Sequence, residues 1–384
     1  MMDGRALYIL LISLVFANAD SNITMIANDF VFTFINLYTE GKSGFILLVL
    51  VSNNNNRTAN VTVDSPYPSF NNITVSVAPY SILKIPITPE SIQAQYLGNM
   101  TTARGQVTVE DKGVRLQSDL PVSVYAHAEV SDGQNADSFL VLPAVHLGTE
   151  YVAVTSTDPN APNMIAVVAY QDNTQISLPT QGVTLNALQV ASVTVKTAVS
   201  CSIISGNKPF GVISGCTCGT VDGICGYEAV MSFPVDDWGT QFAAIPLMFL
   251  TMNYYQVIAN TDNTVVSVGE GTTIVTLNAG EYQRFQIGAA LVTSNYPIQL
   301  IQIGQNTGEK GNNTGGPFFL QLPSTDKMSN TNVLFQPTGF FEYKGVHLVF
   351  FLRIVTNLAG TGTIQLYHIH MEMKKAVGLS AHLT

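Results

Sequence analysis

The chain has 384 residues, and hydrophobic residues make up 46% of it, which excludes a globally disordered protein. Charged residues make up only 11%, and the formal net charge is −10. Nucleic acids and anionic membrane surfaces select for clustered Lys and Arg, and the sequence has no such cluster, so neither is expected as a partner.

Residues 1–19 predict a secretory signal peptide. Arg5 precedes an apolar run over residues 6–16, and residues 17–19 read Ala-Asn-Ala, a small-x-small cleavage pattern. Cleavage is therefore expected between Ala19 and Asp20. The apolar run is too short to span a bilayer, which needs about 20 residues, and no later run is longer. We expect a secreted, extracellular protein without a membrane span.

Acceptor tripeptides for N-glycosylation are concentrated in the first quarter of the chain. Glycans there would provide the solubility that the low charge content does not. The six predicted sites are Asn22, Asn56, Asn60, Asn72, Asn99 and Asn312.

Three landmarks recur in constant order along the chain. A turn ending in proline occurs at Pro121, Pro209 and Pro297, with 88 residues between successive prolines. Asp-Asn-Thr at 172–174 recurs at 262–264, and the apolar-Pro pair at 142–143 recurs at 233–234 and again at 322–323. The pattern predicts tandem repeats of about 90 residues. The predicted boundaries are 1–19 for the signal peptide, 20–138 for a longer first repeat, 139–229, 230–316, and 317–384 for a partial fourth.

Within a repeat the local pattern is that of short strands. Runs rich in Val, Ile, Thr and aromatic residues alternate with Asn, Asp, Gly and Pro. The expected fold is all-β, with each repeat an immunoglobulin-like or jelly-roll sandwich, and a β-propeller is the alternative. A short helix is expected near residues 89–95. The strands expected in the second repeat are 139–142, 151–155, 164–169, 175–178, 183–187, 191–195, 202–204 and 210–214.

The four cysteines lie within 25 residues, and their spacing does not fit a zinc site. In an oxidising compartment an even count predicts two disulfides. Cys216 and Cys218 are too close in sequence to pair comfortably on a strand. Residues 202–205 and 210–214 are expected to form a hairpin, which brings Cys216 within easier reach of Cys201 than Cys218. We therefore predict the pairs Cys201–Cys216 and Cys218–Cys225.

Several motifs together resemble a known family. They include Ser138-Phe139-Leu140-Val141-Leu142-Pro143, the Gly148-Thr149-Glu150-Tyr151 turn, Lys208-Pro209-Phe210-Gly211, the Cys218–Cys225 loop and Trp238-Gly239. Their order and spacing resemble the N-terminal domain of IgG Fc-binding proteins over residues 28–340. The resemblance implies a secreted protein of mucus or extracellular matrix. Such domains are usually followed by von Willebrand D-type modules, which are absent from these 384 residues. The motifs define no antibody-binding residue, so immunoglobulin binding is not inferred.

No pattern of residues predicts catalysis, a metal or a cofactor. Ser214 lies one position away from a nucleophile-elbow spacing and in a strand context. Asp236-Asp237 provides few of the oxygens that calcium needs, and a solvated turn is favoured there. His127 and His146 are interpreted as satisfied strand or loop positions, and Trp238 as packing at a domain junction. The residues His368, His370 and Glu372 are interpreted as the polar face of a half-exposed strand.

The predicted function is therefore that of a non-enzymatic binding or structural module whose partners are extracellular proteins or glycoproteins. The alternative is a secreted carbohydrate-binding or glycan-hydrolysing protein, in which two carboxylates should face each other across a cleft.

Overall fold

The computed structural model describes the chain as an all-β protein, with three 3-10 helices of three residues each in the described part. None of these helices is long enough to cross a membrane. The described residues are 12–15, 25–37, 44–96, 105–130, 135–156, 163–195, 202–221, 224–246, 253–269, 271–304, 318–325, 342–343, 346–347 and 352–355.

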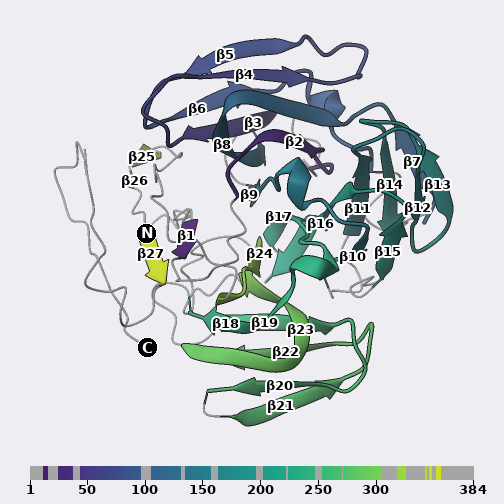
Figure 1. Ribbon diagram of the computed structural model, residues 1–384, viewed down its shortest axis with the longest axis vertical. Helices are drawn as coiled ribbons and strands as arrows, with labels where there is room; N and C mark the ends of the chain where they lie inside the picture. Colours follow the sequence, from purple (N-terminus) through teal and green to yellow (C-terminus); the bar gives the residue numbers. More distant parts are fainter. Residues whose placement is uncertain are drawn as a thin grey trace, which may run out of the picture.

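The first β unit is a seven-stranded sheet that curls around its longest strand, β8 (Figure 1). The first half of β8 pairs with β2 and β4, and the second half pairs with β3 and β9. Strands β5 and β6 extend the sheet from β4 and β3. The strands are β2 (Ala27–Phe32), β3 (Phe45–Asn53), β4 (Ala59–Asp64), β5 (Ile73–Val77), β6 (Ser81–Pro86), β8 (Val114–Val130) and β9 (Ala136–Leu140).

The second unit consists of two sheets that enclose one apolar core, and both contribute residues to it. One sheet has the order β10-β15-β12-β13 and the other β17-β16-β11-β14-β7. The strands are β7 (Val107–Glu110), β10 (Glu150–Val152), β11 (Asn163–Ala169), β12 (Thr174–Ser177), β13 (Gly182–Leu185), β14 (Val190–Val195), β15 (Ile203–Gly206), β16 (Phe210–Val221) and β17 (Ile224–Met231).

The third unit is again a seven-stranded sheet, curled around β23. The first half of β23 pairs with β18 and β20, and the second half with β19 and β24. The strands are β18 (Gly239–Ala244), β19 (Asn253–Ala259), β20 (Thr264–Val268), β21 (Thr272–Leu277), β22 (Tyr282–Ile287), β23 (Ala290–Gly304) and β24 (Phe318–Leu322).

Short elements lie outside or between the three units. The 3-10 helices are η1 (Glu90–Ile92), η2 (Ala144–His146) and η3 (Val235–Asp237), and η1 falls where a short helix was predicted. The remaining pairs of strands are β1 (Ile12–Val15) with β27 (Leu352–Val355), in parallel, and β25 (Glu342–Tyr343) with β26 (Val346–His347).

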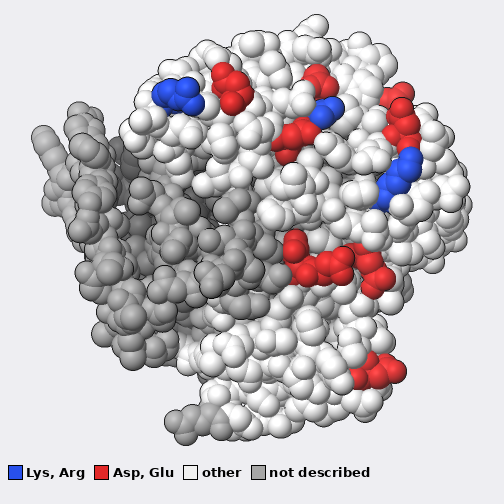
Figure 2. Space-filling model, viewed as in Figure 1, with Lys and Arg blue, Asp and Glu red and all other residues white. Residues whose placement is uncertain are grey.

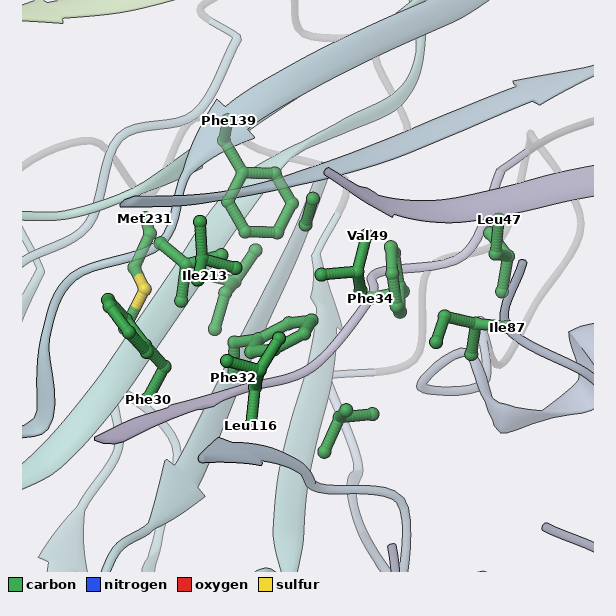
Figure 3. Close-up of a cluster of buried hydrophobic side chains, with 14 of the residues drawn as sticks. Phe30, Phe32, Phe34, Leu47, Val49, Ile87, Leu116, Phe139, Ile213 and Met231 are labelled. Carbon is green, nitrogen blue, oxygen red and sulfur yellow. The ribbon is translucent and has the colours of Figure 1, made fainter. Parts of the chain in front are cut away.

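Strand β17 lies at the centre of the molecule, with the other strands grouped around it (Figure 1). Alternate side chains of a strand point to opposite faces, and the two faces of β17 meet different units. Tyr227, Ala229 and Met231 belong to the core of the first unit, whereas Val230 packs in the cluster shared with the third. Figure 3 shows Met231 among the aromatic side chains of β2. The three units are therefore joined by the buried side chains of one strand, β17.

One side-chain hydrogen bond recurs in all three units. An Asn or Asp two residues before the landmark proline accepts the backbone N–H of the second residue of a strand, at 2.7–2.8 Å. The pairs are Asp119 with Asn60, Asn207 with Gln175, and Asn295 with Val265.

The strands expected in the second repeat are all present, and seven of them begin and end within three residues of the prediction. The eighth, β16, continues to Val221, and the first, β9, belongs to the sheet of the first unit. The pairing of 202–205 with 210–214 is wrong. Strand β15 pairs with β10 and β12, and β16 pairs with β11 and β17, so the chain changes sheets at the turn between them. Asn207 holds that turn against β12 through the bond above. The propeller alternative is not supported, because the sheets curl around long shared strands rather than forming separate blades.

Candidate functional site

A small cavity lies beside the single tryptophan, at the junction of the units. Its volume is about 20 Å³, room for one water molecule. Met25, which precedes β2, contributes to the same wall as residues of η3 and the third unit. The lining residues are Met25, Phe233, Asp237, Trp238, Gly239, Phe242, Ile298, Gln299, Gln321, Leu322, Pro323 and Ser324.

Two buried polar side chains line this cavity without a hydrogen-bond partner in the described part of the chain. They are Gln299, 1% exposed, and Ser324, 3% exposed. An amide buried without a partner costs free energy, and an ordered water would satisfy it. The cavity is far too small for a sugar ring, and Asp237 is the only carboxylate among the described residues that line it. Its size and chemistry fit a hydration site rather than a hydrolase cleft.

Trp238 packs between units, as expected from the sequence. Its side chain is 5% exposed and belongs to a cluster with Val152 of the second unit and Ile301 of the third. The indole Nε1 donates to the carbonyl of Phe233 at 3.3 Å. A ring this buried cannot serve as a surface for stacking sugars.

Two side chains, one just before β9 and one within it, bind the outer edge of β17. The side-chain oxygen of Asn135 accepts the backbone N–H of Tyr227, and Asp137 Oδ2 accepts that of Ala229 at 3.1 Å. The side-chain oxygens thus accept the backbone N–H groups of β17 that the carbonyl groups of a neighbouring strand would otherwise accept. Neither residue was predicted to be functional. The signal in the sequence was two polar side chains two positions apart, immediately before the predicted strand 139–142.

Asp137 combines a half-buried position with two backbone donors. Its Oδ1 accepts the N–H of Ser138 at 2.8 Å, and its Oδ2 accepts that of Ala229. Burial raises the pKa of Asp137 to about 8, although both hydrogen bonds act in the opposite direction. The carboxyl group that joins the first unit to β17 therefore changes its charge in the physiological range.

A second polar link joins the first and second units. The guanidinium of Arg115 donates to both oxygens of Asp29 at 2.8 Å, and the Tyr170 hydroxyl donates to Asp29 Oδ2 at 3.0 Å. Burial acts to raise the pKa of Asp29, but these donors outweigh it, and the pKa is lowered. The bidentate pair fixes Asp29 of β2 against β8, and the single bond from Tyr170, which follows β11, joins this pair to the second unit.

The structure describes one of the predicted disulfide cysteines as oxidised. Cys218 forms a disulfide, and both Cys216 and Cys218 are buried in β16. Cys201 and the side chain of Cys225 lie outside the described residues. The pairing therefore remains a prediction, and its hairpin argument no longer supports it, because β15 and β16 are in different sheets.

Three of the six predicted glycosylation sites lie in the described residues, and all three are exposed: Asn56, Asn60 and Asn72. The side-chain N–H of Asn60 donates to Asp119 Oδ2 at 2.7 Å. Asn22, Asn99 and Asn312 lie outside the described residues, as do Ala19 and Asp20 at the predicted cleavage site.

The remaining candidates for chemistry have structural roles. His127 Nδ1 lies 2.7 Å from Ser138 Oγ, and Nε2 lies 3.2 Å from Glu129. This row has the residue types of a catalytic triad, but the nitrogens are exchanged relative to a serine hydrolase, and cross-strand pairing of β8 with β9 accounts for it.

The hydroxyl of Ser214 is not exposed in a cleft as a nucleophile would be, because its Oγ is buried and accepts the N–H of Val154. Asp236 and Asp237 lie in η3. Within the described ranges no group of three or more His, Cys, Asp or Glu could hold a metal ion. His368, His370 and Glu372 are outside those ranges.

The comparisons with known proteins agree on one family. A family model described as "IgGFc binding protein" matches residues 137–366. The human IgGFc-binding protein is 26% identical over 235 residues, which is 55% of this chain and 4% of that protein. No solved structure matches.

Proposed function

Because the chain belongs to the IgGFc binding protein family, we propose that it is a secreted, non-enzymatic binding or structural module of mucus or extracellular matrix. Family membership carries the proposal, since the matched region covers more than half of the chain. The chain spans only 4% of the length of its human relative. The partner proposed for this module is an extracellular protein or glycoprotein.

The chemistry of the surface supports binding through neutral groups. Figure 2 shows few charged side chains on the described part of this face. They lie in small groups, most of them with both signs, and one group near the middle is acidic only. Charged residues make up 11% of the chain. Recognition by such a surface depends little on Coulomb attraction, so it should survive high salt.

A capture experiment tests this function. The purified protein is immobilised and exposed to mucus or matrix extract at low and at high salt, beside a broad hydrolase screen. Specific retention of extracellular proteins at both salt concentrations is the expected result. Loss of all retention at high salt, or turnover that disappears on mutation of one pair of carboxylates, would contradict the proposal.

Secretion and glycosylation are part of the same proposal. A signal peptide over residues 1–19 and exposure of Asn56, Asn60 and Asn72 support it. Intact-mass measurement of secreted protein should place its first residue at Asp20 and show a decrease in mass after glycan removal. A retained Met1, or an unchanged mass, would contradict this part.

We infer that the three β units are tandem copies of one sandwich-like unit. The predicted boundaries, 20–138, 139–229, 230–316 and 317–384, follow the order of the copies along the chain, although β7 joins the second unit from within the first range and β24 joins the third unit from within the last. The recurring Asx hydrogen bond supports this inference, and so does the strand order. Residues with positive φ also recur, at Tyr80, Leu188 and Gly280, one or two residues before the edge strands β6, β14 and β22.

A further inference from the structure

The three units differ in whether one equivalent edge of their sheets is open to pairing with another strand. The edge strands are β6, β14 and β22, and each follows a residue with positive φ. Counted from that residue, Pro86, Thr194 and Gln286 each lie six positions further on and are equivalent. An open edge presents unpaired N–H and C=O groups that can accept another strand.

In the second unit this edge is covered. Strand β7 pairs antiparallel with β14, with Thr108 opposite Ser192, and Gly105 N–H donates to the carbonyl of Thr194 at 2.9 Å. Residues 190–194 are all buried as a result. Although β7 lies in the long segment between β6 and β8, it completes the sheet of the next unit.

In the first unit the edge is protected by its sequence. Ile87 N–H donates to Leu47, so the backbone groups of residues 82, 84 and 86 point away from β3. Position 86 is proline, which has no N–H, and position 84 is an exposed lysine. Both are common means of preventing strand addition.

In the third unit no proline occupies this edge and no described strand covers it. Arg284, at the position equivalent to Lys84, is half-buried, and its Nε donates to Gln256 Oε1 at 3.0 Å instead of leaving the charge exposed along the edge. Ala259 N–H donates to the carbonyl of Glu281, so the backbone groups of Tyr282, Arg284 and Gln286 point away from β19. Among the described strands β22 pairs only with β19. Tyr282, Gln283 and Gln286 are exposed, and Phe285 of the core is half-buried, whereas its equivalent Val193 is fully buried.

We propose that the free edge of β22 is a docking site for an extended peptide segment, which adds antiparallel as β7 adds to β14. The occupant has β-branched residues alternating with polar ones, because residues 105–110, Gly-Gln-Val-Thr-Val-Glu, complete the equivalent edge. Main-chain hydrogen bonds hold the segment, and its apolar side chains cover Phe285. The site rests on the proposed binding function and gives that function a location.

The test uses a fluorescent peptide with the sequence of residues 105–111 and the full-length secreted protein. Saturable binding is expected, with slowed hydrogen exchange at the amides of Tyr282, Arg284 and Gln286. Gln286→Pro should weaken binding at least tenfold without changing the unfolding midpoint, because Pro86 shows that this position accepts proline. Gln286→Ala should bind within about twofold of wild type, since its N–H remains.

Four results would overturn the site: no saturable binding below about 1 mM, equal binding by a folded Gln286→Pro variant, equal binding by a Thr108→Pro peptide, or protection that appears in β14, where the peptide would be replacing β7. The broader function fails separately, if the wild-type protein captures nothing from matrix extract.

Discussion

The carboxyl group of Asp137 makes stability depend on pH in a direction opposite to that of most carboxylates. Its pKa is about 8 in the folded protein, against 3.8 for the unperturbed group. The folded state therefore binds more protons than the unfolded state between pH 4 and pH 8. Stability from this group is fully present below pH 4 and is lost as the pH rises through 8.

The magnitude follows from the size of the shift. At about 1.4 kcal/mol per pH unit, the free energy of unfolding falls by at most about 4 kcal/mol between pH 4 and pH 7. The value is an upper limit, because the side chain keeps some exposure and solvent relaxation reduces the penalty. A change of this size is a large part of the stability of an ordinary domain.

Urea unfolding of wild type and Asp137→Asn between pH 4 and pH 8 measures the effect. The variant cannot ionise but loses one acceptor, so it should be less stable than wild type at pH 4 and show a weaker dependence on pH. Asp119→Asn is the matched control, since the pKa of Asp119 is lowered by hydrogen bonds from Asn60, and the other two units have Asn at this position. Equal slopes for wild type and Asp137→Asn would refute the reasoning.

Three further predictions concern the fold. Gly215→Ala should lower the free energy of unfolding by about 3 kcal/mol, because the added Cβ would lie 1.9 Å from the carbonyl oxygen of Glu228. The control is Gly182→Ala, where the nearest atom is 3.8 Å from the added Cβ and the cost should be less than about 1 kcal/mol. Thermal unfolding of both variants measures the difference. Asn295→Ala should lower the free energy of unfolding by about 1 kcal/mol through loss of its bond to the backbone N–H of β20, and an unchanged urea midpoint would show that this bond is dispensable. Non-reduced peptide mapping should link Cys218 to Cys225, and its recovery linked to Cys201 would show that the predicted pairing is wrong.

The local pattern of strands was readable from the sequence, but the way the strands combine was not. Turn residues and β-branched runs placed the strands of the second unit because backbone preferences act locally. The sheet change between β15 and β16 depends on which core the following residues enter, and an assumed hairpin therefore gave the wrong neighbour. Asn135 and Asp137 were missed because their partners, Tyr227 and Ala229, are about 90 residues away.

Because the side chains of β17 pack in the cores of more than one unit, the repeats cannot be independently folding domains. A fragment ending near residue 229 would expose Val152 and Val154, because it lacks Val230 and Trp238 of the same cluster. A fragment ending near residue 316 would lack Gln321, whose side chain accepts the N–H of Phe233 at 3.0 Å. Met25, which precedes β2, lines the same cavity as residues of the third unit, so the first and third units also meet there. The three units should melt in one transition, and under tension the protein should resist extension as a single block rather than lengthen one repeat at a time.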